Sequence, residues 1–126
     1  MSFRWSEYLD LAQELTRESL ASPLREAMFR SAISRAYYAA FGQARNRLVT
    51  IDGEEIPRGV NTHQHVIDTF EGSNDSRRRT IGHLLHHLRS TRNAADYESI
   101  FRRDLRGVTR GALGEAEEII RMLEAL

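Results

Sequence analysis

Apolar residues recur three and four positions apart along most of the chain, and this spacing predicts a series of helices. The first predicted helix covers residues 6–19, with Ser6 as the expected N-cap. The second begins at Ser22-Pro23, a capping hydroxyl followed by a proline in the first turn, and runs to about Val49. No stretch alternates apolar and polar residues for long enough to predict a strand.

The second helix carries the longest apolar stripe and is the expected centre of the core. Its stripe comprises Leu24, Met28, Ala32, Ile33, Ala36, Tyr37, Ala40, Phe41, Ala44 and Leu48. The alanines allow a neighbouring helix to approach closely, and the aromatic rings fill the space around that contact. Because adjacent residues point about 100° apart on a helix, at least one of Tyr37 and Tyr38 is expected to face a second surface, such as a partner subunit.

The polar residues from Thr50 to Thr62 predict a long irregular loop, a kind of segment that is often functional. A short helix follows from His63 to about Phe70, with Asn61 or Thr62 as its cap.

A fourth helix is expected after a cap at Asp75 or Ser76, and a last one from Leu105 to Leu126. The connector between them covers residues 96–104. The buried stripe of the fourth helix extends to Arg92. The fold class is therefore all-α: one domain, residues 1–126, built as an up-and-down bundle of four to five helices.

Composition limits the function without defining it. The 18 basic residues are all arginines and balance 18 acidic residues, so any anion binding must come from a local patch. The chain has no cysteine, no apolar run long enough to cross a bilayer and no targeting segment, which makes the cytoplasm the expected location and leaves no membrane partner. There is no glycine-rich phosphate loop, nucleophile elbow or paired-carboxylate motif, and no cofactor is expected.

Two charged clusters lie on the fourth helix. Arg77, Arg78 and Arg79 fall in its first turn, where the helix dipole disfavours cations, so they call for an anion or an acidic neighbour. His83, His86 and His87 have a spacing that could place two imidazoles on one face, but no carboxylate or cysteine joins them at ligand spacing. The sequence therefore predicts no metal site.

The end of the same helix concentrates the remaining polar chemistry in Arg89, Arg92, Asn93, Asp96 and Tyr97. Asp96 lies four residues after Arg92 and can meet it on one face. One interpretation is an internal structural pair that Tyr97 closes. The other is a site in which arginine holds a phosphate while a phenol or an imidazole moves a proton. Spacing alone leaves both open.

Two motifs together resemble a known family. The run from Arg30 to Phe41, with Ser34-Arg35-Ala36-Tyr37-Tyr38-Ala39-Ala40-Phe41 at its core, is followed by His65 and then by Arg92-Asn93-Ala94-Ala95-Asp96-Tyr97. This order is similar to small stand-alone prokaryotic HEPN proteins (higher eukaryotes and prokaryotes nucleotide-binding). The resemblance implies a helical homodimer with the polar segment near the two-fold axis, and often a nucleotidyltransferase-type partner protein in toxin–antitoxin or defence systems.

Ribonuclease members of that family carry an arginine followed four to six residues later by histidine, and cut RNA without metal through the 2′-hydroxyl. Here the residue after four intervening positions is Tyr97, whose ordinary pKa near 10 makes it a poor base at neutral pH. The first hypothesis is thus an RNA- or nucleotide-binding regulatory dimer with a degenerate ribonuclease motif, in which Arg89, Arg92, Asn93 and Asp96 bind the ligand.

Two alternatives remain. One is a metal-independent ribonuclease toxin in which Arg92 acts with Tyr97 or with a histidine from elsewhere in the chain. The other is a purely structural or protein-interaction dimer, cemented by the polar cluster. Whether the protein is an enzyme is left open at this stage.

Overall fold

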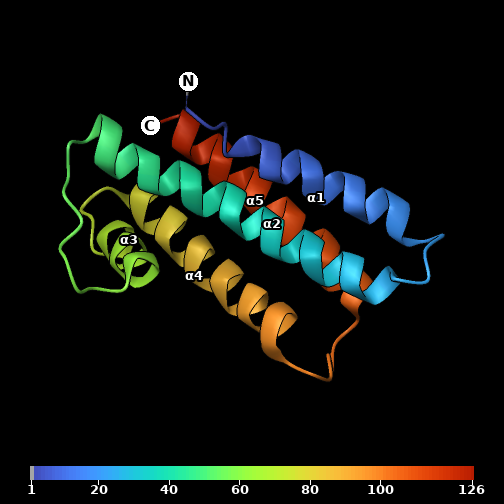
Figure 1. Cartoon of the computed structure of the whole chain (residues 1–126). Helices are drawn as coiled ribbons and strands as arrows, with labels where there is room; N and C mark the ends of the chain where they lie inside the picture. Colours follow the sequence, from blue (N-terminus) through green and yellow to red (C-terminus); the bar gives the residue numbers. More distant parts are fainter. Residues whose placement is uncertain (1) are drawn as a thin grey trace.

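The computed structural model describes residues 2–126, and this part of the chain is helical with no β-strand. The helices are α1 (Ser6–Ser19), α2 (Arg25–Asn46), α3 (Thr62–Glu71), α4 (Ser76–Tyr97) and α5 (Leu105–Glu124). Figure 1 shows α1, α2, α4 and α5 running alternately up and down, with the short α3 beside the start of α4. The predicted all-α bundle is confirmed.

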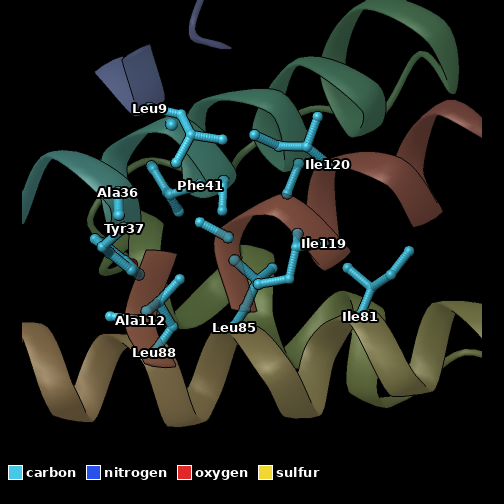
Figure 2. Packing of buried hydrophobic residues seen from close by; sticks show 14 of the residues in the cluster. Leu9, Ala36, Tyr37, Phe41, Ile81, Leu85, Leu88, Ala112, Ile119 and Ile120 are labelled. Carbon is cyan, nitrogen blue, oxygen red and sulfur yellow. The ribbon is translucent and has the colours of Figure 1, made fainter. Parts of the chain in front are cut away.

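Helix α2 is the centre of the bundle, as its apolar stripe predicted, because it contacts every other helix. Five of its alanines are fully buried, which lets α1, α4 and α5 pack closely around it. Figure 2 shows side chains from α2, α4 and α5 pointing into one shared core, among them Tyr37, Leu85 and Ile119. The predicted stripe is wrong at Leu24, which is 66% exposed, whereas Phe29 is buried.

Several helix boundaries differ from the prediction. Ser6 is the first helical residue rather than the N-cap, and α1 starts without a side-chain cap. The Ser22 hydroxyl accepts a hydrogen bond from the Leu24 amide (3.0 Å), so it closes a turn before α2 instead of capping the helix. By contrast, Asn61 and Asp75 accept hydrogen bonds from amides in the first turns of α3 and α4, and both predicted caps are confirmed.

Helix α2 does not stop at Asn46 but widens into a π-helical turn, Arg47–Ile51. The irregular loop begins only after this turn. Asp52, its first residue, is fixed by Arg78 of α4 (2.8 Å) and by Arg47 (3.3 Å). The hydrogen bond from Arg78 lowers the pKa of Asp52 below its ordinary value.

The other arginines at the start of α4 also have partners within the chain. Arg77 pairs with Asp75 (2.9 Å), and this hydrogen bond lowers the pKa of Asp75 to about 2. Arg79 donates to the carbonyl oxygen of Ser73 (2.9 Å). The expected anion or acidic neighbour of this triplet is therefore supplied mainly by Asp52 and Asp75.

Glycines allow two close approaches that set the geometry of the bundle. A Cβ on Gly82 would lie 2.6 Å from the backbone nitrogen of Glu71, so α3 and α4 touch here almost backbone to backbone. A Cβ on Gly42 would lie 2.1 Å from the indole ring of Trp5, which covers α2 at that point. Within residues 2–126, none of the helices has the length and apolar character required to cross a bilayer.

Candidate functional site

Arg92 is the centre of a polar network at the interface of α2 and α4. Only 12% of its side chain is exposed. Its Nη2 donates to the Tyr38 hydroxyl (2.8 Å) and its Nη1 to Asn93 Oδ1 (2.9 Å). Its Nε lies 2.9 Å from Asp96 Oδ2, which makes an ion pair although the N–H is not aligned for a hydrogen bond. The structure therefore brings Arg92, Asn93 and Asp96 together.

Aromatic rings surround this guanidinium. It lies 5.1 Å from the ring centroid of Tyr38, and 5.7 Å from those of Tyr37 and Tyr97. The Arg35 guanidinium also lies near Tyr38, 5.0 Å from the centroid of its ring. Cation–π contacts of this kind add to the hydrogen bonds when the guanidinium is largely withdrawn from water. The rings thus fix the direction of Arg92.

Asp96 belongs to α4 rather than to the connector that the sequence predicted, and its position on the helix lets it reach back to Arg92. The Ser34 hydroxyl donates to the same carboxylate oxygen at 3.3 Å. A carboxylate held by an arginine and a hydroxyl is poorly placed to receive a phosphate, because the two anions repel each other. Its geometry suits it to holding Arg92 in place.

The N-terminus of α3 brings His63 to this network across the loop. Its Nδ1 lies 2.6 Å from the hydroxyl oxygen of Tyr37, and its ring stacks on Phe41 with centroids 4.2 Å apart. Burial lowers the pKa of His63 below 6.5, and the positive charges of Arg89 and Arg92 lower it further. His63 is therefore neutral at pH 7.

Tyr37 is fully buried, and this burial raises the pKa of its hydroxyl above the ordinary value of about 10. The phenol keeps its proton at neutral pH and can either donate to His63 or accept from it. If His63 Nδ1 carries the proton and donates to the phenol, then the second ring nitrogen, Nε2, is free to accept a proton. This tautomer would serve proton transfer.

Arg89 lies one turn before Asn93 on the outer side of α4. Its Nη1 donates to the Gln64 side-chain oxygen of α3 at 3.0 Å, while its Nε is buried without a hydrogen-bond partner. Gln64, Arg89, Ser90 and Asn93 line a hollow of about 160 Å³ together with Ile67 and His86. This hollow joins α3 to α4 and is bordered by groups that can donate hydrogen bonds.

A second hollow, of about 720 Å³, shares Ser90 and Asn93 with the first. It is lined by Ser90, Asn93, Ala94, Tyr97, Glu98, Arg102 and Arg103. Tyr97 is 74% exposed, so its phenol is available to solvent and to a ligand. Of the predicted site residues, Arg89, Asn93 and Tyr97 face these hollows, whereas Arg92 and Asp96 form the layer behind them.

The histidine cluster on α4 has carboxylate partners that the sequence spacing did not reveal. Glu71 of α3 lies 3.0 Å from His83 Nδ1 and 3.3 Å from His86 Nδ1. His87 pairs with Glu115 of α5 at 2.8 Å. Both carboxylates come from other helices, α3 and α5, so the spacing of the histidines along α4 could not indicate them. No set of three or more ligand side chains within residues 2–126 is arranged to hold a metal ion.

The C-terminus of α4 is held by Arg30 of α2. Its Nη1 donates to the carbonyl oxygens of Ala95 (3.1 Å) and Glu98, which no longer have helical partners. Its guanidinium also lies 5.6 Å from the Phe101 ring in the following connector. This contact fixes the position of Tyr97 and of the connector that follows it.

The lowered pKa of His63 predicts a pH-dependent stability. A neutral His63 contributes stability that is complete above about pH 6.5, the value in the unfolded chain, and is lost as the pH falls through the lower pKa of the folded state. In urea unfolding, the wild type should therefore lose more stability than His63→Gln between about pH 7 and about pH 5. Equal losses in the two proteins would contradict the contact.

Sequence reasoning named Arg89, Arg92, Asn93, Asp96 and Tyr97, but it placed neither Tyr38 nor His63 at the same site. The sequence predicts only that at least one of Tyr37 and Tyr38 faces a second surface, whereas the Tyr38 hydroxyl accepts a hydrogen bond from Arg92 of α4. The sequence places His63 only at the start of the third helix. Its hydrogen bond with Tyr37, which is 26 residues away, depends on the course of the loop and cannot be predicted from the spacing of nearby residues.

Comparisons of this chain with protein-family models, with curated proteins and with solved structures find no match.

Proposed function

We propose that the chain is a HEPN-like homodimer that binds RNA or a nucleotide on the outer face of α4 and acts as a regulatory component without efficient cleavage. The observation that carries this proposal is the pair of adjoining hollows with an exposed tyrosine and a half-buried arginine among their lining residues. Phosphate oxygens are bound by guanidinium and amide donors, and bases stack on exposed aromatic rings.

Each residue of the site has a separate role in the proposed ligand binding. Arg89 and the amide group of Asn93 contact phosphate directly. Arg92 donates a hydrogen bond to the side-chain oxygen of Asn93, so the NH₂ group of Asn93 remains able to donate to a ligand. The Arg92 guanidinium also adds positive charge beneath this surface. Asp96 keeps Arg92 in that position, and the Tyr97 ring stacks or hydrogen-bonds. The proposed cellular setting is a toxin–antitoxin or defence system with a nucleotidyltransferase-type partner.

The test is the binding of a fluorescein-labelled single-stranded RNA, followed by anisotropy at low salt. Arg89→Gln is expected to weaken binding about tenfold, the loss of one charge-assisted contact. Arg110→Gln is the matched control, since it removes an exposed arginine that lines a different hollow, on α5. Sedimentation should show twice the 14.5 kDa mass of the chain. Equal affinities of wild type and Arg89→Gln would reject the proposed surface.

A metal-independent ribonuclease is the second candidate, and the neutral His63 beside Arg89 and Arg92 favours it. In this reaction His63 would take the proton of a ribose 2′-hydroxyl as that oxygen attacks phosphorus. The bond from phosphorus to the 5′-oxygen would break, and that oxygen would take a proton from solvent water, leaving a cyclic phosphate on the ribose. RNA cleaved in EDTA by the wild type but not by His63→Gln, with cyclic phosphate ends, would establish it. Intact RNA after prolonged incubation would reject it.

A further inference from the structure

The binding face does not end with α4, because the second hollow continues onto the connector of residues 98–104. Ser90 and Asn93 line both hollows, so the two adjoin along the outer side of the helix. His86, Ser90, Asn93 and Tyr97 lie on a single helical stripe. At 1.5 Å per residue, the stripe from His86 to Tyr97 is about 16 Å long.

Positive charge increases towards the connector end of the two hollows. Arg102 and Arg103 line the second hollow there, and neither is paired with a carboxylate in the part of the chain that the structure describes. Glu98 is the one carboxylate among the lining residues, against Arg89, Arg102 and Arg103. The lining of these hollows is positively charged although the whole chain has no net charge, so this surface is complementary in charge to a polyanion.

The connector is anchored rather than loosely attached. Arg30 holds the carbonyl oxygen of Glu98 and lies 5.6 Å from the Phe101 ring. The Arg103 guanidinium lies 5.2 Å from the same ring. These contacts fix the backbone from which Arg102 and Arg103 extend, so the two arginines start from a defined position next to Tyr97.

We infer that Arg102 and Arg103 form a second phosphate subsite, and that the ligand of the proposed binding face is a single-stranded oligonucleotide rather than a mononucleotide. This inference rests on the proposed function. One phosphate contacts Arg89 and Asn93, the exposed Tyr97 ring receives a base, and a following phosphate contacts the connector arginines. A mononucleotide, with a single phosphate position, would contact only one of the two phosphate subsites along this stripe of about 16 Å.

The experiment compares AMP with an oligoadenylate of about ten nucleotides, a length within the range of known single-strand sites. The proteins are wild type, the double variant Arg102→Gln with Arg103→Gln, and the control Arg106→Gln with Arg110→Gln. The control removes two arginines that line the separate hollow between α1, α2 and α5. Circular dichroism melts verify that both double variants fold.

The wild type should bind the oligomer at least about tenfold more tightly than AMP, and the connector variant should lose this preference while its AMP affinity stays unchanged. Because each neutralised phosphate contributes about 0.7 to the salt slope for single strands, loss of the one phosphate at the connector should lower the slope by about 0.7 in the connector variant and leave it constant in the control. If the salt slope of the connector variant equals that of the control variant, the inferred phosphate subsite is wrong, while the proposed binding face still stands. A wild type that binds neither ligand would overturn the proposed function as well.

Discussion

Replacing Arg92 with alanine is expected to lower the free energy of unfolding by about 3 kcal/mol. Removing one partner of a buried pair costs about 3 to 5 kcal/mol, and the 25% exposure of the Asp96 side chain reduces that cost towards the lower end. The variant would also leave the Tyr38 hydroxyl and Asn93 Oδ1 without their donor. Urea unfolding at neutral pH measures the loss.

The matched control is Arg121→Ala, which removes a 74% exposed arginine from its i,i+3 pair with Glu118 on α5. Exposed pairs contribute little, so this variant should change stability by less than about 1 kcal/mol. A similarly small change in Arg92→Ala would mean that the network around it is not structural. Domains of this kind are stable by about 5 to 15 kcal/mol, and Arg92→Ala should therefore still fold at room temperature.

The double-mutant cycle with Asp96→Ala separates the ion pair from the rest of the network. If Asp96 serves mainly to hold Arg92, removing both side chains should cost less than the sum of the two single losses. Additive losses would show that the two side chains act independently, in spite of the 2.9 Å between Arg92 Nε and Asp96 Oδ2.

The second large effect is expected at Gly82. A methyl group there would lie 2.6 Å from the backbone nitrogen of Glu71 and 2.6 Å from its Cγ. Backbone cannot rotate away as a side-chain end can, so Gly82→Ala should move α3 away from α4 at a cost of about 3 kcal/mol, the upper part of the usual overpacking range.

Gly114→Ala is the control for this substitution. Gly114 is also helical, but a Cβ added there meets nothing within 4 Å. Alanine should stabilise the helix at that position by about 0.5 to 1 kcal/mol, since glycine loses more backbone entropy on folding. Thermal unfolding of both variants gives the comparison. Gly82→Ala as stable as the wild type would contradict the close helix contact.

The sequence predicted the helices because burial imposes a repeat of three to four residues, which is visible in the pattern of α2 and α5. It predicted the Arg92–Asp96 pair for the same reason, since residues four apart share a helical face. Leu24 shows the limit of this reasoning. It continues the stripe of α2, but it lies before the first helical residue, where the chain has not yet entered the core.

Contacts between distant elements could not be predicted in this way. Asp52 meets Arg78, Glu71 meets two histidines of α4, and His63 meets Tyr37 only after the loop and the crossing of α3 are fixed in space. Each of these pairs joins residues on separate elements, so their spacing along the chain carries no periodic signal. Tertiary packing decides them.

The most direct test of the proposed binding face is an amide NMR titration of the protein with the oligoadenylate. Asn93 and Gln64 line the hollow between α3 and α4, whereas the side-chain NH₂ group of Gln13 lies on α1 and donates to Glu117 of α5. The proposal predicts shifts at Asn93 and Gln64 with little change at Gln13. Shifts confined to Gln13 and its surroundings, or none at all, would contradict it.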